Sequence, residues 1–166
     1  MGESILNGKS ILAVDDEFDV LAILEEEILE SCSKCEFDKA STFEEALKKL
    51  ASRTYDLVIL DIMGVRGFDL LERANPKKSP VVMLTAHALS PEALKRSVEM
   101  GARAYLPKEE LGEIVPFLED VLLHEYLPGW KRLLKKLESF FNTLWGDDWK
   151  KSDEKFWKEF DEKVHW

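Results

Sequence analysis

Five short strand patterns recur along the chain, at residues 10–14, 36–40, 57–61, 81–85 and 104–107. The clearest is 57–61, where four consecutive apolar residues are closed by an aspartate. An apolar run this short is typical of a strand buried on both faces, as parallel sheets require. Each strand pattern is followed by a helical one. The alternation predicts an α/β fold with a doubly wound, five-stranded parallel sheet and right-handed crossovers.

The helical segments between the strands carry start and stop signals. Ser41 or Thr42 is placed to cap one helix, and Ser90 with Pro91 begins another that Gly101 ends. With these signals and the spacing of apolar residues, we predict helices over 19–32, 43–52, 68–74, 91–100 and 110–127.

A second segment follows Pro128-Gly129, which we predict to end the last of these helices. All five tryptophans lie beyond this point, and apolar residues recur at helical spacing on both sides of Gly146. We therefore divide the chain into a domain over 8–127 and an amphipathic helical hairpin over 130–166. The hairpin could fold back on the domain, pair two chains in a helical bundle, or lie on a membrane surface.

Charge and composition exclude several classes of function. The net charge of −10 over 166 residues argues against direct nucleic-acid binding. No apolar run approaches the ~20 residues that span a bilayer, and the N-terminus lacks the pattern of a signal peptide. Since residues 130–166 are nearly neutral, membrane association is disfavoured, and we expect a cytoplasmic protein. Cys32 and Cys35 fall at the end of a helix without a second cysteine pair, which favours partly buried thiols over a redox or zinc site.

Polar side chains gather where the predicted strands end. Asp15 and Asp16 follow the first strand, Asp61 ends the third, Thr85 ends the fourth, and Lys108 follows the fifth. An acid in such a place can simply cap the next helix, but three carboxylates at one sheet edge repel each other unless a cation joins them. A Mg²⁺ ion held by oxygen ligands fits this set. Asp61 could then act as a nucleophile toward a phosphoryl group, with the Lys108 ammonium and the Thr85 hydroxyl on the transferring oxygens.

The same residues resemble the receiver domain of two-component response regulators over roughly residues 8–127. The motifs that carry this resemblance are Asp-Asp at 15–16, Asp-Ile-Met at 61–63, Thr-Ala at 85–86 and Tyr-Leu-Pro-Lys at 105–108. The resemblance implies strand order 2-1-3-4-5. It also implies a protein that is not an enzyme, apart from self-phosphorylation and autodephosphorylation.

The resemblance further implies a role for each matching residue. Asp61 is the phosphoacceptor and a Mg²⁺ ligand, together with Asp16 directly, Asp15 directly or through water, and the backbone carbonyl of Met63. Thr85 moves to bond the phosphoryl group that Lys108 pairs with, and Tyr105 is the aromatic residue that rotates in the switch. The donor would be a histidine kinase or a phosphotransfer protein. A homodimer could form through the C-terminal helices or through the face made by the fourth helix, fifth strand and fifth helix.

The loop after Asp61 departs from the family pattern. Receivers usually carry a proline and a later glycine in this loop, but here the sequence Ile-Met-Gly-Val-Arg-Gly follows, without proline and about two residues short. The alternative is a receiver-fold interaction module that phosphorylation does not regulate. An independent phosphatase is disfavoured, because Ile62 and Met63 stand where such enzymes have Asp-x-Asp. Met63 and His87 occupy positions that influence dephosphorylation in the family.

Overall fold

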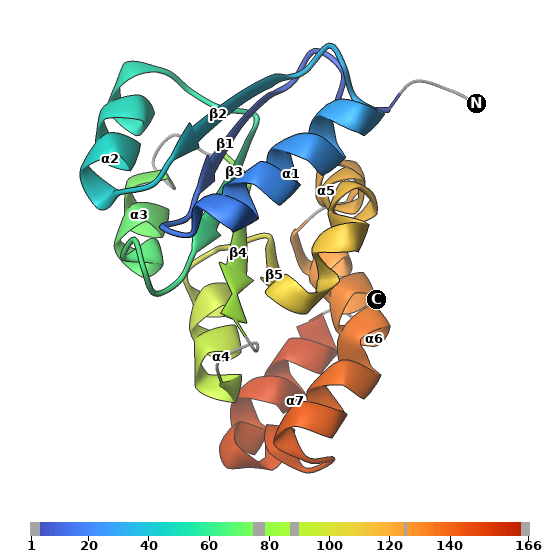
Figure 1. The fold of residues 1–166 in the computed structure, drawn as a ribbon. Helices are drawn as coiled ribbons and strands as arrows, with labels where there is room; N and C mark the ends of the chain where they lie inside the picture. Colours follow the sequence, from blue (N-terminus) through green and yellow to red (C-terminus); the bar gives the residue numbers. More distant parts are fainter. Residues whose placement is uncertain (1–3, 75–78, 87–89, 125, 164–166) are drawn as a thin grey trace.

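A central parallel sheet organises the chain, as the strand patterns predict (Figure 1). The computed structural model describes residues 4–74, 79–86, 90–124 and 126–163. The sheet has the order β2-β1-β3-β4-β5, and every neighbouring pair of strands is parallel. The predicted order 2-1-3-4-5 is therefore confirmed. The strands are β1 (Ser10–Val14), β2 (Glu36–Ala40), β3 (Leu57–Asp61), β4 (Val81–Thr85) and β5 (Ala104–Pro107).

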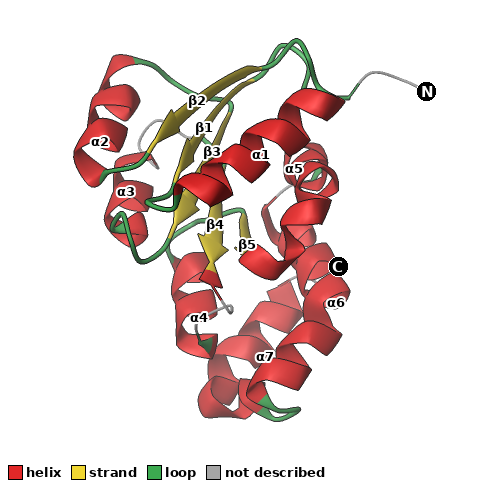
Figure 2. Cartoon of the chain, in the orientation of Figure 1, coloured by secondary structure: helices red, strands yellow, loops and turns green. Residues whose placement is uncertain are grey.

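Helices cover both faces of this sheet (Figure 2). Helices α1 and α5 pack together on one face, whereas α2, α3 and α4 lie on the other. All residues of β1, β3, β4 and β5 are buried, which explains why these strands read as continuous apolar runs. The helices are α1 (Phe18–Ser31), α2 (Phe43–Ser52), α3 (Gly67–Ala74), α4 (Pro91–Glu99) and α5 (Ile114–Leu123).

Two predicted helix caps are confirmed. The Thr42 hydroxyl accepts a hydrogen bond from the backbone nitrogen of Glu45 (3.1 Å), and the Ser90 hydroxyl accepts one from that of Ala93 (3.2 Å). Each bond satisfies a nitrogen that the helix itself leaves without a partner. Gly101 follows α4 with φ +89°, a backbone conformation that glycine adopts without strain.

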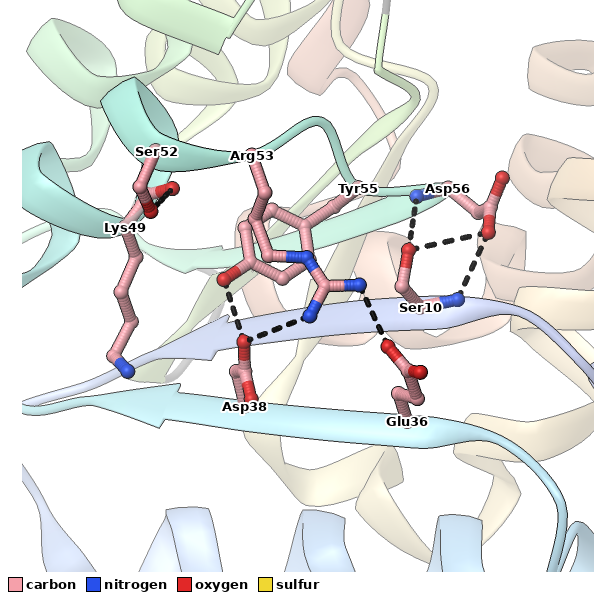
Figure 3. Close-up of polar contacts among 8 residues, drawn as sticks. All are labelled: Ser10, Glu36, Asp38, Lys49, Ser52, Arg53, Tyr55 and Asp56. Carbon is pink, nitrogen blue, oxygen red and sulfur yellow. Dashed lines mark hydrogen bonds and ion pairs between the residues drawn. The ribbon is translucent and has the colours of Figure 1, made fainter.

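Polar side chains also fix the amino-terminal part of the sheet (Figure 3). The carboxylate of Asp56 accepts hydrogen bonds from the Ser10 backbone nitrogen (2.8 Å) and hydroxyl (3.2 Å), which joins the starts of β1 and β3. The Tyr55 hydroxyl donates to Asp38 on β2 (2.6 Å). Arg53 pairs with Glu36 on the same strand (2.6 Å). The hydrogen-bonding and charged groups of these residues pair with one another, so we assign this end of the sheet a role in stability rather than in binding.

The prediction of one helix over 110–127 is wrong in both boundaries. A 3-10 helix, η3 (Lys108–Glu113), precedes α5, and α6 (Tyr126–Trp145) already includes Pro128 and Gly129. Proline is tolerated there because the first turn of a helix does not use its backbone N–H groups. The break lies at His124, where the Arg103 guanidinium donates to the backbone carbonyls of Val121 (3.2 Å) and His124. These bonds satisfy carbonyls that the end of α5 leaves without intrahelical partners.

Residues 126–163, hereafter the tail, fold back on the domain. The predicted hairpin is confirmed as α6, a turn at Gly146 (φ +86°), a 3-10 helix η4 (Trp149–Asp153) and α7 (Glu154–Lys163). Helix α6 runs along β5 and α5, and Lys95 on α4 lies over the ring of Phe156 on α7 (Figure 1). The open edge of the sheet at β5 is therefore covered, which removes a row of exposed backbone groups.

Within the described ranges, none of the helices has the length and apolar content that crossing a bilayer requires.

Candidate functional site

The carboxyl edge of the sheet brings together the three predicted acids. Val14 pairs with Leu60 across β1 and β3, so Asp15 emerges from β1 next to Asp61 at the end of β3. Oxygen atoms of Asp15, Asp16 and Asp61 lie within 4.8 Å of one another. Asp15 is fully buried and Asp61 is 4% exposed, whereas Asp16 faces solvent. The acidic cluster therefore has a buried base and an open side.

Lys108 provides the positive charge at this edge. Its Nζ atom lies 3.0 Å from Oδ2 of Asp15, 3.4 Å from Oδ1 of Asp61 and 2.6 Å from Oε1 of Glu17. Burial disfavours the charged ammonium, but the bonds to Glu17 and Asp15 and the neighbouring carboxylate charges outweigh it and raise the pKa of Lys108. The ammonium stays charged at physiological pH.

Sequence reasoning missed Glu17. Its backbone nitrogen donates to Oδ1 of Asp15 (2.8 Å), while its side chain holds Lys108. The signal was available, because Glu17 continues the acidic run that begins at Asp15. However, a strand-end pattern gives no reason to separate Glu17 from an ordinary first-turn acid.

The two buried carboxyl groups have raised pKa values. Burial is the largest cause for Asp61, and the charge of Asp15 adds to it, so that the pKa rises to about 6 despite Lys108 and a bond from Gly64. Burial likewise raises the pKa of Asp15, against the hydrogen bond from the Glu17 backbone and the nearby Lys108 ammonium. The positive charge of Lys108 therefore offsets only part of the cost of burying these two carboxylates in their charged form.

The geometry fits a divalent cation. Oδ2 of Asp15 is buried and makes no well-directed hydrogen bond within the described residues, although Lys108 Nζ lies 3.0 Å away. A buried carboxylate oxygen without a directed partner, next to two further carboxylates, is the donor set of a hard cation. Asp15, Asp16 and Asp61 are the residues that could hold it.

The short loop after Asp61 closes tightly over the cluster. The backbone nitrogen of Gly64 donates to Oδ2 of Asp61 (3.2 Å), and a Cβ atom at Gly64 would overlap the Asp16 carboxylate. The Met63 carbonyl, the predicted further metal ligand, accepts a bond from the Arg66 nitrogen (3.3 Å). Its second lone pair is not used by this bond. Glycine at 64 therefore lets the backbone approach both acids.

The two remaining predicted residues, Thr85 and Tyr105, are both buried behind the acidic cluster. Thr85 ends β4 one residue beyond Leu84, the register partner of Asp61, and is buried. Its hydroxyl donates a long bond to the Ala86 carbonyl (3.4 Å). Burial raises the pKa of the nearby Tyr105 hydroxyl, and the Thr85 side chain partly offsets this effect. Tyr105 is fully buried beneath the tail rather than exposed at the edge. Thr85 therefore stands between the acidic cluster and the tail.

Other sequence features do not join the site. His87 lies outside the described residues. Cys32 and Cys35 are both buried free thiols, as predicted. Burial, together with the neighbouring Cys32, raises the pKa of Cys35 to about 12. Such a thiol carries almost no reactive thiolate at neutral pH.

Most of the chain is similar to one family of known proteins. The family model of the response regulator receiver domain matches residues 11–117. A crystal structure of a CheY-like response regulator receiver domain protein from Methanospirillum hungatei is 28% identical, with a TM-score of 0.57 over 68% of this chain and 94% of that one. Residues 118–166 lie outside the matched family segment.

Curated relatives share the same region. A gliding motility regulatory protein from Myxococcus xanthus is 38% identical over 81 residues, which cover 45% of this chain and 10% of that protein. The two-component response regulator ARR18 from Arabidopsis thaliana is 36% identical over 107 residues, 61% of this chain and 16% of that protein. The matched segments thus span less than a fifth of each of these two relatives.

Proposed function

Because the chain belongs to the response regulator receiver family, we propose that it accepts a phosphoryl group on Asp61 from a histidine kinase or a phosphotransfer protein, in a reaction that depends on Mg²⁺. The observation that carries this proposal is the packing of three carboxylates within 4.8 Å of one another, with the Lys108 ammonium 3.4 Å from Asp61. Such a set is costly without a bound cation and a charge-bearing ligand.

The chemistry is a transfer between two nucleophiles. A carboxylate oxygen of Asp61 forms the new P–O bond while the P–N bond to the donor imidazole breaks, and the imidazole nitrogen keeps the electron pair and takes a proton from water. Bound Mg²⁺ would neutralise charge on the phosphoryl oxygens, with Asp15, Asp16, Asp61 and the Met63 carbonyl as the residues that hold it. Hydrolysis restores the carboxylate and releases inorganic phosphate.

Two side chains assist this transfer. The Lys108 ammonium, already 3.4 Å from Asp61, pairs with a phosphoryl oxygen, and the charge-assisted bond is stronger than a neutral one. The Thr85 hydroxyl donates a long bond to the Ala86 carbonyl (3.4 Å), so it gives up little of this bond when it turns to the phosphoryl group. Tyr105 responds to that movement as the switch residue. Outside this transfer and autodephosphorylation, the protein is not an enzyme.

The output is a protein contact. We divide the chain into a receiver over 8–127 and a helical extension over 130–166, and we place the protein in the cytoplasm, where it signals to a protein target rather than to nucleic acid or a membrane. Homodimerisation through the helical extension is one form that this contact takes. A dimer through the face of α4, β5 and α5 would require the tail, which packs on β5 and α5, to leave that face.

A second candidate function is an interaction module that phosphorylation does not regulate. Glu17 favours it, because this carboxylate holds Lys108 more closely than Asp61 does (2.6 against 3.4 Å). The short loop, in which Arg66 engages the Met63 carbonyl, favours it as well.

Incubation with Mg²⁺ and a small phosphodonor separates the two functions. Intact-mass spectrometry should find one acid-labile phosphoryl adduct on the wild-type chain and none on Asp61→Ala. Asp69→Asn is the matched control, because this acid on α3, with 48% of its side chain accessible, pairs with Arg66 outside the cluster, and it should retain the adduct. Absence of the adduct with a phosphodonor and with a phosphotransfer protein would favour the second candidate. Sedimentation of the same samples measures whether phosphorylation changes the oligomeric state.

A further inference from the structure

We propose that the tail is an internal ligand of the β5 surface, and that its docking and the phosphorylation of Asp61 strengthen each other through Thr85, Tyr105 and Phe141. The proposal rests on the proposed function, because it needs a phosphoryl group at Asp61. It adds a role for residues 126–163, which lie beyond the segment that the family model matches.

The tail is anchored at both ends of α6. Near its start, the buried Trp130 donates its Nε1–H to the Ala102 carbonyl (2.7 Å), immediately before β5. Beyond its end, Asp153 forms an ion pair with Lys95 on α4, and Lys95 also lies over the Phe156 ring (5.2 Å to its centroid). The anchors tie the tail to the loop before β5 and to α4, and α6 packs along β5 and α5.

Phe141 lies midway between these anchors and contacts Tyr105 directly. The two ring centroids are 6.3 Å apart with an interplanar angle of 57°, and both side chains are fully buried. Behind Phe141, the Trp145 ring stacks at 4.8 Å, and Trp149 packs against both. Since Tyr105 and Phe141 are both fully buried and in contact, the docked tail blocks Tyr105 from turning toward α6.

On its other side, Tyr105 reaches the acidic cluster through one residue. Its hydroxyl donates to the Ser90 carbonyl at the start of α4 (3.5 Å). Tyr105 pairs with Met83 across β5 and β4, and Thr85 lies two residues beyond Met83, so the Tyr105 and Thr85 side chains share one face of the sheet. Thr85 follows Leu84, which pairs with Asp61 across the sheet. A single buried hydroxyl therefore separates the phosphoacceptor strand from the residue that the tail holds.

Phosphorylation and tail docking favour each other because of the space that the Thr85 side chain leaves when it moves. When the Thr85 hydroxyl turns to a phosphoryl group on Asp61, it withdraws from the Tyr105 hydroxyl. Tyr105 can fill the vacated space only while Phe141 keeps its ring inward. If the tail undocks, Tyr105 can rotate out, and an unfilled cavity beside Thr85 costs free energy. The phosphorylated state therefore prefers the docked tail, and by linkage the docked tail favours phosphorylation.

Beryllofluoride with Mg²⁺ serves as the probe of the phosphorylated state, and ¹⁹F NMR measures its binding without relying on the tail. We expect Phe141→Ala to bind beryllofluoride about fivefold or more weakly than the wild-type full chain, the lower range of typical allosteric couplings. Leu144→Ala is the matched control, because this residue on the same helix is 44% exposed, and it should bind as the wild type does. Asp153→Asn removes the charge that pairs with Lys95 but keeps a side-chain oxygen that can accept from the Phe156 backbone nitrogen, so it should weaken binding in the same direction by less.

The reverse effect is measured in the same samples. All five tryptophans lie in residues 130–166, so tryptophan fluorescence reports on the tail alone. Beryllofluoride should change this fluorescence in the wild type and in Leu144→Ala, but not in Asp61→Asn. Unchanged or tighter binding by both Phe141→Ala and Asp153→Asn, with helical content intact by circular dichroism, overturns the coupling and leaves the proposed function standing. If the wild type does not bind beryllofluoride at all, the proposed function fails and the coupling fails with it.

Discussion

Lys108 is held by Glu17, whose Oε1 atom lies 2.6 Å from the lysine Nζ. The same ammonium lies 3.4 Å from Asp61, the proposed phosphoacceptor. Glu17 is an exposed partner, with 59% of its side chain accessible, whereas Asp61 is almost fully buried. The exposed carboxylate therefore competes with the buried one for a single cation.

We expect Glu17→Gln to tighten beryllofluoride binding, because Lys108 then has only Asp15 and Asp61 as anionic partners. An exposed ion pair contributes at most about 1 kcal/mol, so the gain in affinity should not exceed about fivefold. Isothermal titration calorimetry in excess Mg²⁺ measures it. Asp19→Asn removes the same charge from the first turn of the same helix without contacting Lys108, and it should leave the affinity unchanged. Weaker binding by Glu17→Gln would mean that Glu17 positions Lys108 rather than competing for it.

Alanine substitutions at the two glycines in the loop after Asp61 should affect different properties, Mg²⁺ affinity in one case and stability in the other. A Cβ atom at Gly64 would overlap the Asp16 carboxylate, which can rotate away. We expect Gly64→Ala to lower Mg²⁺ affinity roughly tenfold, as changes that misorient a metal ligand do, with little loss of stability in metal-free buffer. A Cβ atom at Gly67 would instead overlap the Asp61 backbone carbonyl, which cannot move. Gly67→Ala should therefore lower the free energy of unfolding by about 1–3 kcal/mol. Calorimetric Mg²⁺ titration and urea unfolding measure the two effects, and equal loss of stability in both variants would contradict this distinction.

The raised pKa of Asp61 predicts how stability depends on pH without divalent metal. The pKa rises from 3.8 to about 6 on folding, so between these values the folded state binds more protons than the unfolded state. The free energy of unfolding therefore falls as pH rises through this window, by an amount on the order of 3 kcal/mol. Asp61→Asn should be more stable than the wild type at about pH 7 and nearly equal to it at about pH 4.

Urea unfolding in a chelator at both pH values measures this difference. Asp69→Asn, which changes a half-exposed acid outside the cluster, should show no such pH-dependent gain. A wild type more stable than Asp61→Asn at neutral pH would contradict the prediction, because the buried negative charge would then be stabilising.

Replacing each of two tail tryptophans by phenylalanine should lower the free energy of unfolding by different amounts. Trp130→Phe leaves the Ala102 carbonyl without its donor in a buried place, which should lower the free energy of unfolding by about 2 kcal/mol. Trp145 has a buried Nε1–H without a hydrogen-bond partner among the described residues, so Trp145→Phe removes no such bond and should cost less. Chemical denaturation of the full chain compares them. Equal losses would show that ring volume, rather than the Trp130 hydrogen bond, holds the start of α6.

Much of the candidate site could be predicted from the sequence because parallel strands end at one common edge. Strands buried on both faces read as apolar runs, and the predicted bounds of 57–61 and 81–85 agree with β3 and β4. Once the strands are known, Asp15, Asp61 and Lys108 must meet at the same edge of the sheet.

The partners of those residues could not be predicted in the same way. Whether Lys108 bonds to Glu17 or to Asp61 is a matter of less than an ångström between side chains from distant segments. Similarly, Pro128 is a plausible helix stop, but the helix ends near His124. It ends there because Arg103, which precedes β5, donates to the backbone carbonyls at that point. Local signals contain no information about such groups.

The sequence by itself determined that this chain forms a five-stranded parallel sheet with an acidic carboxyl edge, followed by two amphipathic helices, because strand and helix periodicities are local properties. Only the tertiary structure decided where those helices go. An apolar stripe gains about the same free energy per unit of buried area against its own sheet, a second chain or a lipid surface. The choice in favour of β5 came from shape and specific bonds, the fit of Phe141 on Tyr105 and the bond from Trp130 to Ala102.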